Sequence, residues 1–271
     1  MTELLIHSVS EFSDIILGCL DAAKVRNIVE IGAEYGGMSQ QLGAFVEAAD
    51  GMLTSIDPAP KPAFLAWSQG FAHSRHIAST SLEAIPALGN VDAWIIDGDH
   101  NYFTVYNELH AIDAVCGRDG KPLLVFLHDV GWPCARRDFY YAPDQIPAKH
   151  RKPYSYSAGT VLDHDGLVEG GGMRGNGNYA LATHSGGPGN GVMTAVEDYI
   201  ADAAAAGGNL AWAFVPAVFG LGVLFETKAP WSEALAALLL PYHENTLIAA
   251  LERNRLLNYL RVIAHQDRMA G

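Results

Sequence analysis

The sequence has little of what marks several protein classes. Its three cysteines, Cys19, Cys116 and Cys134, are scattered and form no CxxC pair. We therefore expect neither a disulfide framework nor a structural zinc site. The expected location is a reducing cytoplasm. No positively charged N-terminal segment precedes a long apolar core, and Pro and Gly interrupt the apolar runs, so we expect no secretory signal and no membrane span. The net charge of −13 argues against partners such as nucleic acid or an anionic membrane surface.

What the sequence does have is enough apolar material for a substantial core. The chain has 271 residues, of which 49% are hydrophobic and 17% charged. These values are typical of a well-packed globular protein of this length. We therefore predict a single domain over residues 1–271, beginning with a helical segment at 1–25.

Short, almost wholly apolar runs alternate with helix-like segments through the first half of the chain, at residues 26–32, 51–58, 75–80, 91–97 and 122–129. Buried strands that alternate with helices indicate a parallel sheet covered on both faces. Ligands of such sheets bind at the carboxyl ends of the strands. The polar residues that end these runs, Glu30, Asp57, Thr80, Asp97 and Asp129, are therefore candidates for one site.

The pattern changes after residue 129. Residues 130–190 are rich in Gly, Pro and Tyr, which is typical of a lid or binding loop. Residues 191–227 then predict a helix and two strands whose short connection at Gly220 requires antiparallel pairing. Residues 228–271 predict helices interrupted at Pro241, with an apolar stripe of leucines and isoleucines that is either core or a dimer face.

A glycine-rich turn follows the first predicted strand in "VEIGAEYGGMSQ", with Gly32 and Gly36 between strand and helix. Its spacing is neither the GxGxxG of nicotinamide-binding folds nor the GxxxxGK[ST] of a P-loop. Asp57 at the end of the second strand could accept hydrogen bonds from a ribose, or could cap the next helix. Glu30, Gly32 and Asp57 together predict a nucleoside pocket in residues 26–129.

The stretches "VEIGAEYGG", "SIDP" and "WIIDGDH", followed by the antiparallel pair, resemble the class I S-adenosylmethionine-dependent methyltransferases from about Val29 to Thr227. The resemblance implies a Rossmann-like α/β fold: a seven-stranded, mostly parallel sheet with its last strand antiparallel, a lid insertion after strand 5 and a C-terminal helical extension. It places Gly32 near the methionine part of S-adenosyl-L-methionine and Asp57 at the ribose. The cofactor-binding residues expected from it are Glu30, Gly32, Gly36, Asp57, Ser79, Thr80 and Asp97.

Within that superfamily, "IDGDHNYFTVYNEL" and "GVMTAVEDYI" most resemble metal-dependent O-methyltransferases of sugars and other natural products. The resemblance implies metal ligands at Asp97, His128 and Asp129. A divalent ion there would chelate substrate oxygens and lower a hydroxyl pKa, with Asp99 as the general base. His100 could be a ligand, a support for one, or an alternative base. The competing interpretation is that Asp97 and Asp99 only cap the following helix.

One position departs from the pattern, because the sugar-type relatives usually carry a second carboxylate where this chain has His128. Carboxylates suit Mg²⁺, whereas an imidazole suits Mn²⁺, Fe²⁺ or Zn²⁺ better. Alternatively no metal binds and His128 is itself the base.

The predicted lid contains aromatic and arginine residues that could contact an acceptor. Aromatic rings can stack on a ring or a sugar face, and arginine can pair with a carboxylate or phosphate. The expected substrate-binding residues are Trp132, Arg136, Arg137, Tyr140 and Tyr141.

These patterns predict an enzyme that transfers a methyl group from S-adenosyl-L-methionine to a hydroxyl of a small molecule, with a divalent metal as a second candidate cofactor and a homodimer as the expected assembly. The first alternative is a metal-independent N-methyltransferase that uses His128 or Asp99 as base. A nicotinamide-dependent oxidoreductase and a non-catalytic cofactor-binding protein are further alternatives. The acceptor cannot be named from the sequence.

Overall fold

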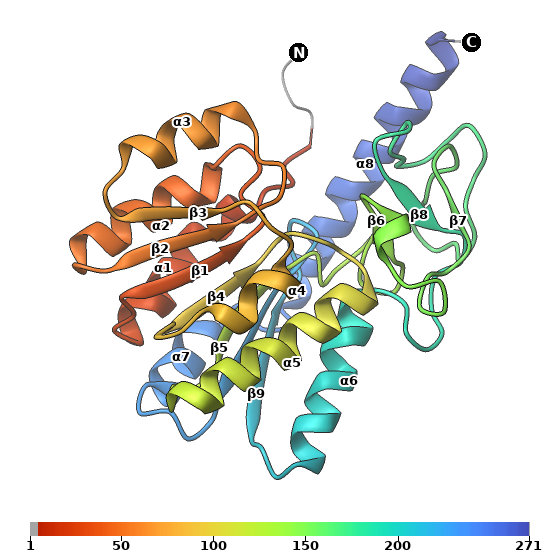
Figure 1. Cartoon of the computed structure of the whole chain (residues 1–271). Helices are drawn as coiled ribbons and strands as arrows, with labels where there is room; N and C mark the ends of the chain where they lie inside the picture. Colours follow the sequence, from red (N-terminus) through yellow and green to blue (C-terminus); the bar gives the residue numbers. More distant parts are fainter. Residues whose placement is uncertain (1–4, 271) are drawn as a thin grey trace.

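Residues 5–270 are described by a computed structural model, and a seven-stranded sheet runs through it with helices on both faces (Figure 1). The strand order is β3-β2-β1-β4-β5-β10-β9. Strands β1 to β5 pair in parallel, whereas β10 pairs antiparallel with both β5 and β9. The strands are β1 (Asn27–Ile31), β2 (Met52–Ile56), β3 (Ser74–Ile77), β4 (Ala93–Ile96), β5 (Leu124–His128), β9 (Leu210–Val215) and β10 (Leu221–Glu226). The predicted mostly parallel sheet with an antiparallel last strand is confirmed.

Alternate strand residues enter two different apolar clusters, which explains why the strands are apolar on both faces. In β4, Trp94 and Ile96 pack with α5 and α6, whereas Ala93 and Ile95 pack with α1, α2 and α7. The helical elements are η1 (Val9–Phe12), α1 (Ser13–Ala22), α2 (Gly37–Ala48), α3 (Pro62–Gly70), α4 (Ser81–Ala84), η2 (Ile85–Ala87), α5 (Tyr102–Asp119), α6 (Val192–Ala205), α7 (Ser232–Leu239) and α8 (Thr246–Ala270).

The loop between β4 and α5 is fixed at its end by a helix cap. Asn101 precedes α5, and its side-chain oxygen accepts a hydrogen bond from the backbone N–H of Thr104 at 2.9 Å. This contact satisfies a donor that the first turn of a helix otherwise leaves free. Asn101, and not Asp97 or Asp99, is therefore the capping residue, and the interpretation of the two aspartates as caps is wrong.

The insertion at 130–190 contains a small sheet of its own, in the order β6-β8-β7, beside the distal half of α8 (Figure 1). Its elements are β6 (Phe139–Tyr140), η3 (Pro143–Gln145), β7 (Tyr154–Ser155) and β8 (Ala180–Ala182). Arg174 pairs with Asp267 of α8, and the Phe139 N–H donates to the His100 carbonyl at 3.1 Å. The insertion thus contacts both the C-terminal helix and the loop after β4.

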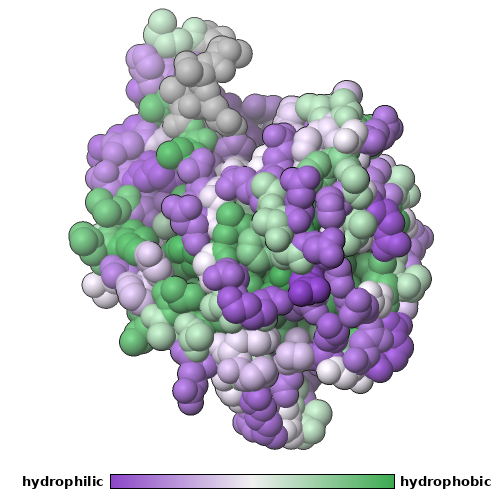
Figure 2. Space-filling model, turned by 90° about the vertical axis from the view of Figure 1, so that its left-hand side faces the viewer, coloured by the Kyte–Doolittle hydropathy of each residue, from purple (hydrophilic) through white to green (hydrophobic). Residues whose placement is uncertain are grey.

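The predicted interruption at Pro241 is confirmed, since α7 ends at Leu239 and α8 begins at Thr246. The apolar stripe of α8 is only partly core, because Leu256 is 3% exposed but Leu247 and Leu251 are 68% and 61% exposed. Hydrophobic and hydrophilic areas lie side by side on the face shown in Figure 2. Among the helices of residues 5–270, none combines the length and the hydropathy that crossing a bilayer requires.

Candidate active site

The glycine-rich turn after β1 lies directly against the end of β4. Gly32 has φ +88°, and a Cβ at this position would lie 2.2 Å from the Asp97 carbonyl oxygen. A side chain is therefore excluded both by the backbone conformation and by the close approach. Gly36 has φ +83° and immediately precedes α2. The two glycines shape an open turn at the carboxyl edge of the sheet, where the cofactor is expected.

Asp57 links this turn to the end of β2. One carboxylate oxygen accepts the backbone N–H groups of Ala33 and Glu34, each at 3.0 Å, and the other accepts the N–H of Ala59 at 2.8 Å. The residue before α3 is Lys61, so Asp57 does not cap that helix. Its role at a ribose stays a prediction, and the structure adds that it holds the glycine-rich turn in place.

Glu30 lies beneath the turn and is only 2% exposed. Its carboxylate accepts hydrogen bonds from Ser39 of α2 at 2.6 Å and Ser55 of β2 at 2.7 Å. Burial raises the pKa of Glu30 to about 7, although the two hydroxyls lower it in part. Glu30 thus supports the turn from inside, and its contact with the cofactor stays a prediction.

Ser79 and Thr80, two of the expected cofactor-binding residues, follow β3, which ends earlier than predicted, at Ile77. The Ser79 hydroxyl donates to Glu83 at 2.9 Å, and Thr80 directly precedes α4. Both are partly exposed at the same edge of the sheet as Asp57.

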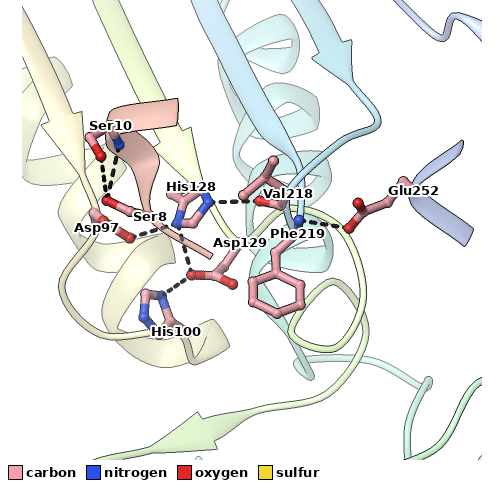
Figure 3. A network of polar contacts seen from close by, with 9 residues as sticks. All are labelled: Ser8, Ser10, Asp97, His100, His128, Asp129, Val218, Phe219 and Glu252. Carbon is pink, nitrogen blue, oxygen red and sulfur yellow. Dashed lines mark hydrogen bonds and ion pairs between the residues drawn. The ribbon is translucent and has the colours of Figure 1, made fainter. Parts of the chain in front are cut away.

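At the other end of the site, three side chains converge from the ends of β4 and β5 (Figure 3). Asp97, His100 and Asp129 each offer a ligand atom, and these atoms lie within 4.8 Å of one another. His100 Nδ1 is 3.4 Å from Asp129 Oδ2. Two carboxylates and an imidazole are donors that suit a divalent transition metal, so the residues present fit a metal ion of that kind.

His128 lies at the end of β5, as predicted, and both of its ring nitrogens contact oxygen atoms of the protein. Its Nδ1 lies 2.9 Å from Asp97 Oδ1 and 3.2 Å from Asp129 Oδ2, and its Nε2 lies 2.8 Å from the Val218 carbonyl oxygen (Figure 3). All three partners are acceptors, so both ring nitrogens must carry protons. Burial alone would lower the pKa of His128, but Asp129 and Asp97 outweigh it and raise the pKa well above its usual value.

A doubly protonated imidazole has no lone pair for a metal or for an incoming proton. This protonation state disfavours His128 as a metal ligand or as the general base, and both roles stay predictions. The donor atoms that lie together belong to Asp97, His100 and Asp129. The same contacts act on Asp129: burial would raise its pKa, but His100 and His128 hold that pKa at about 2. Asp129 is thus a carboxylate at neutral pH.

Asp99 remains a candidate base. Burial raises its pKa above the usual value for an aspartate, which His100 and the hydroxyl of Thr104 offset in part. Thr104 Oγ1 donates to Asp99 Oδ2 at 3.3 Å. A raised pKa makes a carboxylate a stronger proton acceptor near neutral pH.

Of the five predicted substrate-binding residues, Tyr141 lies beside His100 and Trp132 lies beside the turn between β9 and β10. The Tyr141 ring is 6.0 Å from the His100 ring and is 54% exposed. Trp132 lies near Phe219, with ring centroids 6.4 Å apart. Their roles toward an acceptor stay predictions.

The other three make contacts within the protein, and their roles toward an acceptor also stay predictions. Arg137 is 1% exposed and donates to the backbone carbonyls of Asp165, Gly166 and Ala182. The Tyr140 hydroxyl donates to buried Asp138 at 2.7 Å. Arg136 forms a two-point ion pair with Glu197 of α6 at 2.5 and 2.6 Å. Side chains whose donors are already satisfied have little left for an acceptor.

Two groups that support the site carry no signal in the sequence. The Val218 carbonyl reaches His128 from the turn after β9, and the Glu252 carboxylate of α8 accepts the Phe219 N–H of that turn (Figure 3). Any residue supplies a carbonyl, and both lie about 90 or more residues from the motifs around Asp97 and His128. Only the fold brings them together.

The sheet order, the glycine-rich turn and the acidic strand ends define a class I methyltransferase fold. Residues 29–130, from β1 to just beyond β5, match a family model described as "Methyltransferase domain". This part of the chain, which holds Glu30, Gly32, Asp57 and Asp97, is therefore similar to a methyltransferase domain.

Several solved structures resemble the chain at low identity. A putative caffeoyl-CoA O-methyltransferase from Staphylococcus aureus is 15% identical, with a TM-score of 0.47, 82% of this chain covered and 86% of that one. An O-methyltransferase from Bacillus cereus, in complex with SAH, is 12% identical, with a TM-score of 0.48 and coverage of 82% and 84%. The SAH-bound methyltransferase PaMTH1 of Podospora anserina is 13% identical, with a TM-score of 0.45 and coverage of 79% and 77%. No curated protein matches the chain.

Proposed function

We propose that the chain methylates a hydroxyl group of a small molecule, such as a sugar or another natural product, with S-adenosyl-L-methionine as donor. The observation that carries the proposal is the convergence of Asp97, His100 and Asp129 at the strand ends next to the turn containing Gly32. A methyl transfer needs the acceptor aligned with the donor and relieved of its proton. Asp99 lies in the same loop and is the proposed base.

A divalent ion held by Asp97, His100 and Asp129 would supply charge that favours the deprotonated acceptor. The protein residues balance the charges of the site and exclude water from it. His128 donates to both carboxylates and so reduces their mutual repulsion. Burial around the loop excludes water and strengthens these charge interactions. Without a metal, Asp99 would still remove the proton from the acceptor. His128 would still offset the negative charge of Asp97 and Asp129.

The charges of the site favour a neutral or cationic acceptor. Asp97 and Asp129 converge at the strand ends and Asp99 lies in the loop after β4, while the two arginines predicted there are engaged by Glu197 and by backbone carbonyls. An acceptor bearing a carboxylate or phosphate would meet uncompensated negative charge. We therefore propose an uncharged polyhydroxylated or phenolic acceptor beside Tyr141.

The test is calorimetric titration of metal-stripped protein with S-adenosylhomocysteine, repeated with Mn²⁺ and with Mg²⁺. We expect micromolar binding of the cofactor product, and a separate Mn²⁺ heat that Asp97→Ala removes and Asp113→Ala, exposed on α5, preserves. A folded protein that binds no S-adenosylhomocysteine would contradict the proposal. Cofactor binding without a metal heat would select the metal-free mechanism.

A second candidate function is transfer to nitrogen without a metal. The raised pKa of Asp99 favours it, since a buried carboxylate could take the proton of an ammonium group. Asp99 would then be the base, since His128 already donates to the Val218 carbonyl and to the carboxylates. An acceptor screen that compares amines with alcohols distinguishes the two reactions.

We also propose a homodimer that buries the exposed leucines of α8. Leu247 and Leu251 lie one turn apart on the helix, so they form one apolar face. Sedimentation of the protein and of a Leu247→Glu/Leu251→Glu double variant is the test. A wild-type monomer at micromolar concentration would contradict this proposal and leave the catalytic one intact.

A further inference from the structure

The turn between β9 and β10 has an unusual backbone. Val218, Phe219 and Gly220 have φ values of +44°, +64° and +93° in succession. A positive φ is strained for a β-branched residue such as valine. Such strain persists only when surrounding contacts hold the backbone in place.

The turn is pressed against the loop that follows β5. The Gly131 N–H donates to the Phe219 carbonyl at 2.5 Å. A Cβ on Gly131 would lie 2.5 Å from that same oxygen, and a Cβ on Gly220 would lie 2.6 Å from the Gly131 nitrogen. Neither glycine could carry a side chain unless the turn moved away from the loop after β5.

On its other side the turn is held by α8. Glu252 Oε1 accepts the Phe219 N–H at 3.1 Å (Figure 3). Arg255, one turn further along the helix, donates to both oxygens of Glu252 at 2.6 and 2.7 Å and lies over the Phe219 ring, 5.2 Å from its centroid. Glu252 is therefore itself held in one orientation, with its acceptor directed at the turn.

The strained turn presents the Val218 carbonyl to the active site. That oxygen accepts from His128 Nε2 at 2.8 Å, while His128 Nδ1 faces Asp97 and Asp129. The imidazole is rigid, so a displacement of the carbonyl would rotate the ring and move its other nitrogen away from the carboxylates. The contacts run without interruption from α8 through the turn to the strand ends.

We propose that Glu252 is a positioning residue, which holds the Val218–Gly220 turn so that its carbonyl fixes His128 between Asp97 and Asp129. Arg255 assists by orienting Glu252. The consequence for methyl transfer rests on the proposed function, whereas the effect on His128 does not. The C-terminal helix is thereby a part of the active-site architecture.

The experiment is nuclear magnetic resonance of the histidine ring ¹⁵N–H groups at fixed pH, in cofactor-free protein. In the wild type we expect a slowly exchanging Nε2–H proton for His128, because this nitrogen faces the Val218 carbonyl oxygen; its signal is assigned through its loss in His128→Gln. In Glu252→Ala we expect the Nε2–H to exchange with water at least tenfold faster. Glu252→Gln should restore slow exchange, because the amide oxygen still accepts the Phe219 N–H.

Arg253→Ala is the matched control on the same helix, since Arg253 pairs with exposed Asp163 and not with the turn. It should leave the His128 signals unchanged. If Glu252→Ala does not fold, Glu252→Asp replaces it, because the shorter side chain withdraws the acceptor while keeping the charge. Unchanged His128 exchange in the folded Glu252 variant would overturn the proposal.

S-Adenosylhomocysteine binding separates this inference from the proposed function. Glu252→Ala should bind it within twofold of the wild type, because the turn containing Gly32 is untouched. With an acceptor in hand, kcat should fall at least tenfold with little change in the KM for the cofactor. If the wild type bound no S-adenosylhomocysteine, the methyltransferase proposal would fail, while the His128 exchange rates would still decide the role of Glu252.

Discussion

The buried carboxyl group of Glu108 should make stability depend on pH in a way that one substitution removes. Glu108 lies on α5 and is fully buried, and among residues 5–270 neither of its oxygens has a hydrogen-bond partner. Burial raises its pKa to about 8, despite partial opposition from the nearby Ser81 hydroxyl. The folded protein therefore keeps this proton at neutral pH, whereas the unfolded chain releases it near its usual pKa of about 4.3.

The sign and size of the effect follow from proton linkage. The stability associated with this proton is fully present below pH ~4 and is lost as the pH rises through the folded-state pKa of about 8. Between pH 5 and pH 7 the folded state holds nearly one proton more than the unfolded state. Each pH unit then lowers the free energy of unfolding by ~1.4 kcal/mol, so the wild type should lose about 2–3 kcal/mol that Glu108→Gln does not lose.

Urea unfolding followed by circular dichroism, at pH 5 and pH 7, measures this difference. Comparing the pH dependence of the two proteins cancels the cost of burying the amide, which is the same at both pH values. Glu47→Gln, exposed on α2, is the control. If Glu108→Gln and the wild type differed equally at both pH values, Glu108 would be ionised in the folded protein and the reasoning would be refuted.

Three further predictions follow from close contacts. Gly32→Ala should lower the free energy of unfolding, measured by urea titration, by at least about 2 kcal/mol. Gly120→Ala should lower it clearly less, because the φ of Gly120 is also positive but its Cβ would meet nothing within 4 Å. Equal losses in the two variants would refute the clash of a Gly32 side chain with Asp97. Asp138→Ala should cost about 3 kcal/mol or more by the same assay, because its carboxylate accepts N–H groups at the starts of both α5 and α6; a neutral change would contradict this. Asp57→Ala should weaken calorimetric binding of S-adenosylhomocysteine at least tenfold without removing a Mn²⁺ heat.

The sheet could be predicted because strands that are buried on both faces consist almost wholly of apolar residues, and such runs are easily recognised in the sequence. Each predicted parallel strand overlaps an observed one, and the polar residues at their carboxyl ends do meet at one edge. The antiparallel pair was predictable from the short connection at Gly220 alone. Strand β3 was predicted too long, since Ala78 to Thr80 continue the chain without pairing.

The partners of individual side chains could not be predicted. Arg137 looked like an acceptor-binding residue because arginines in loops so often bind anions, yet three carbonyls of the insertion surround it. Nothing in a sequence marks carbonyls that become close only after folding. Asn101 was overlooked as a cap because the acidic residues before it are equally good caps.

His128 shows how one such partner changes the chemistry of a site. With a carboxylate at this position, three negative charges would converge at the strand ends and would require a metal or another cation. The imidazolium supplies a positive charge from the protein itself, so the cluster of Asp97, His128 and Asp129 carries a net charge of about −1 instead. The lower charge weakens attraction for a hard ion such as Mg²⁺ and leaves His100 to favour a softer one. The geometry of the site then depends on the residues that orient the imidazole. These are the strained turn that contains Val218 and, through Glu252, the C-terminal helix α8.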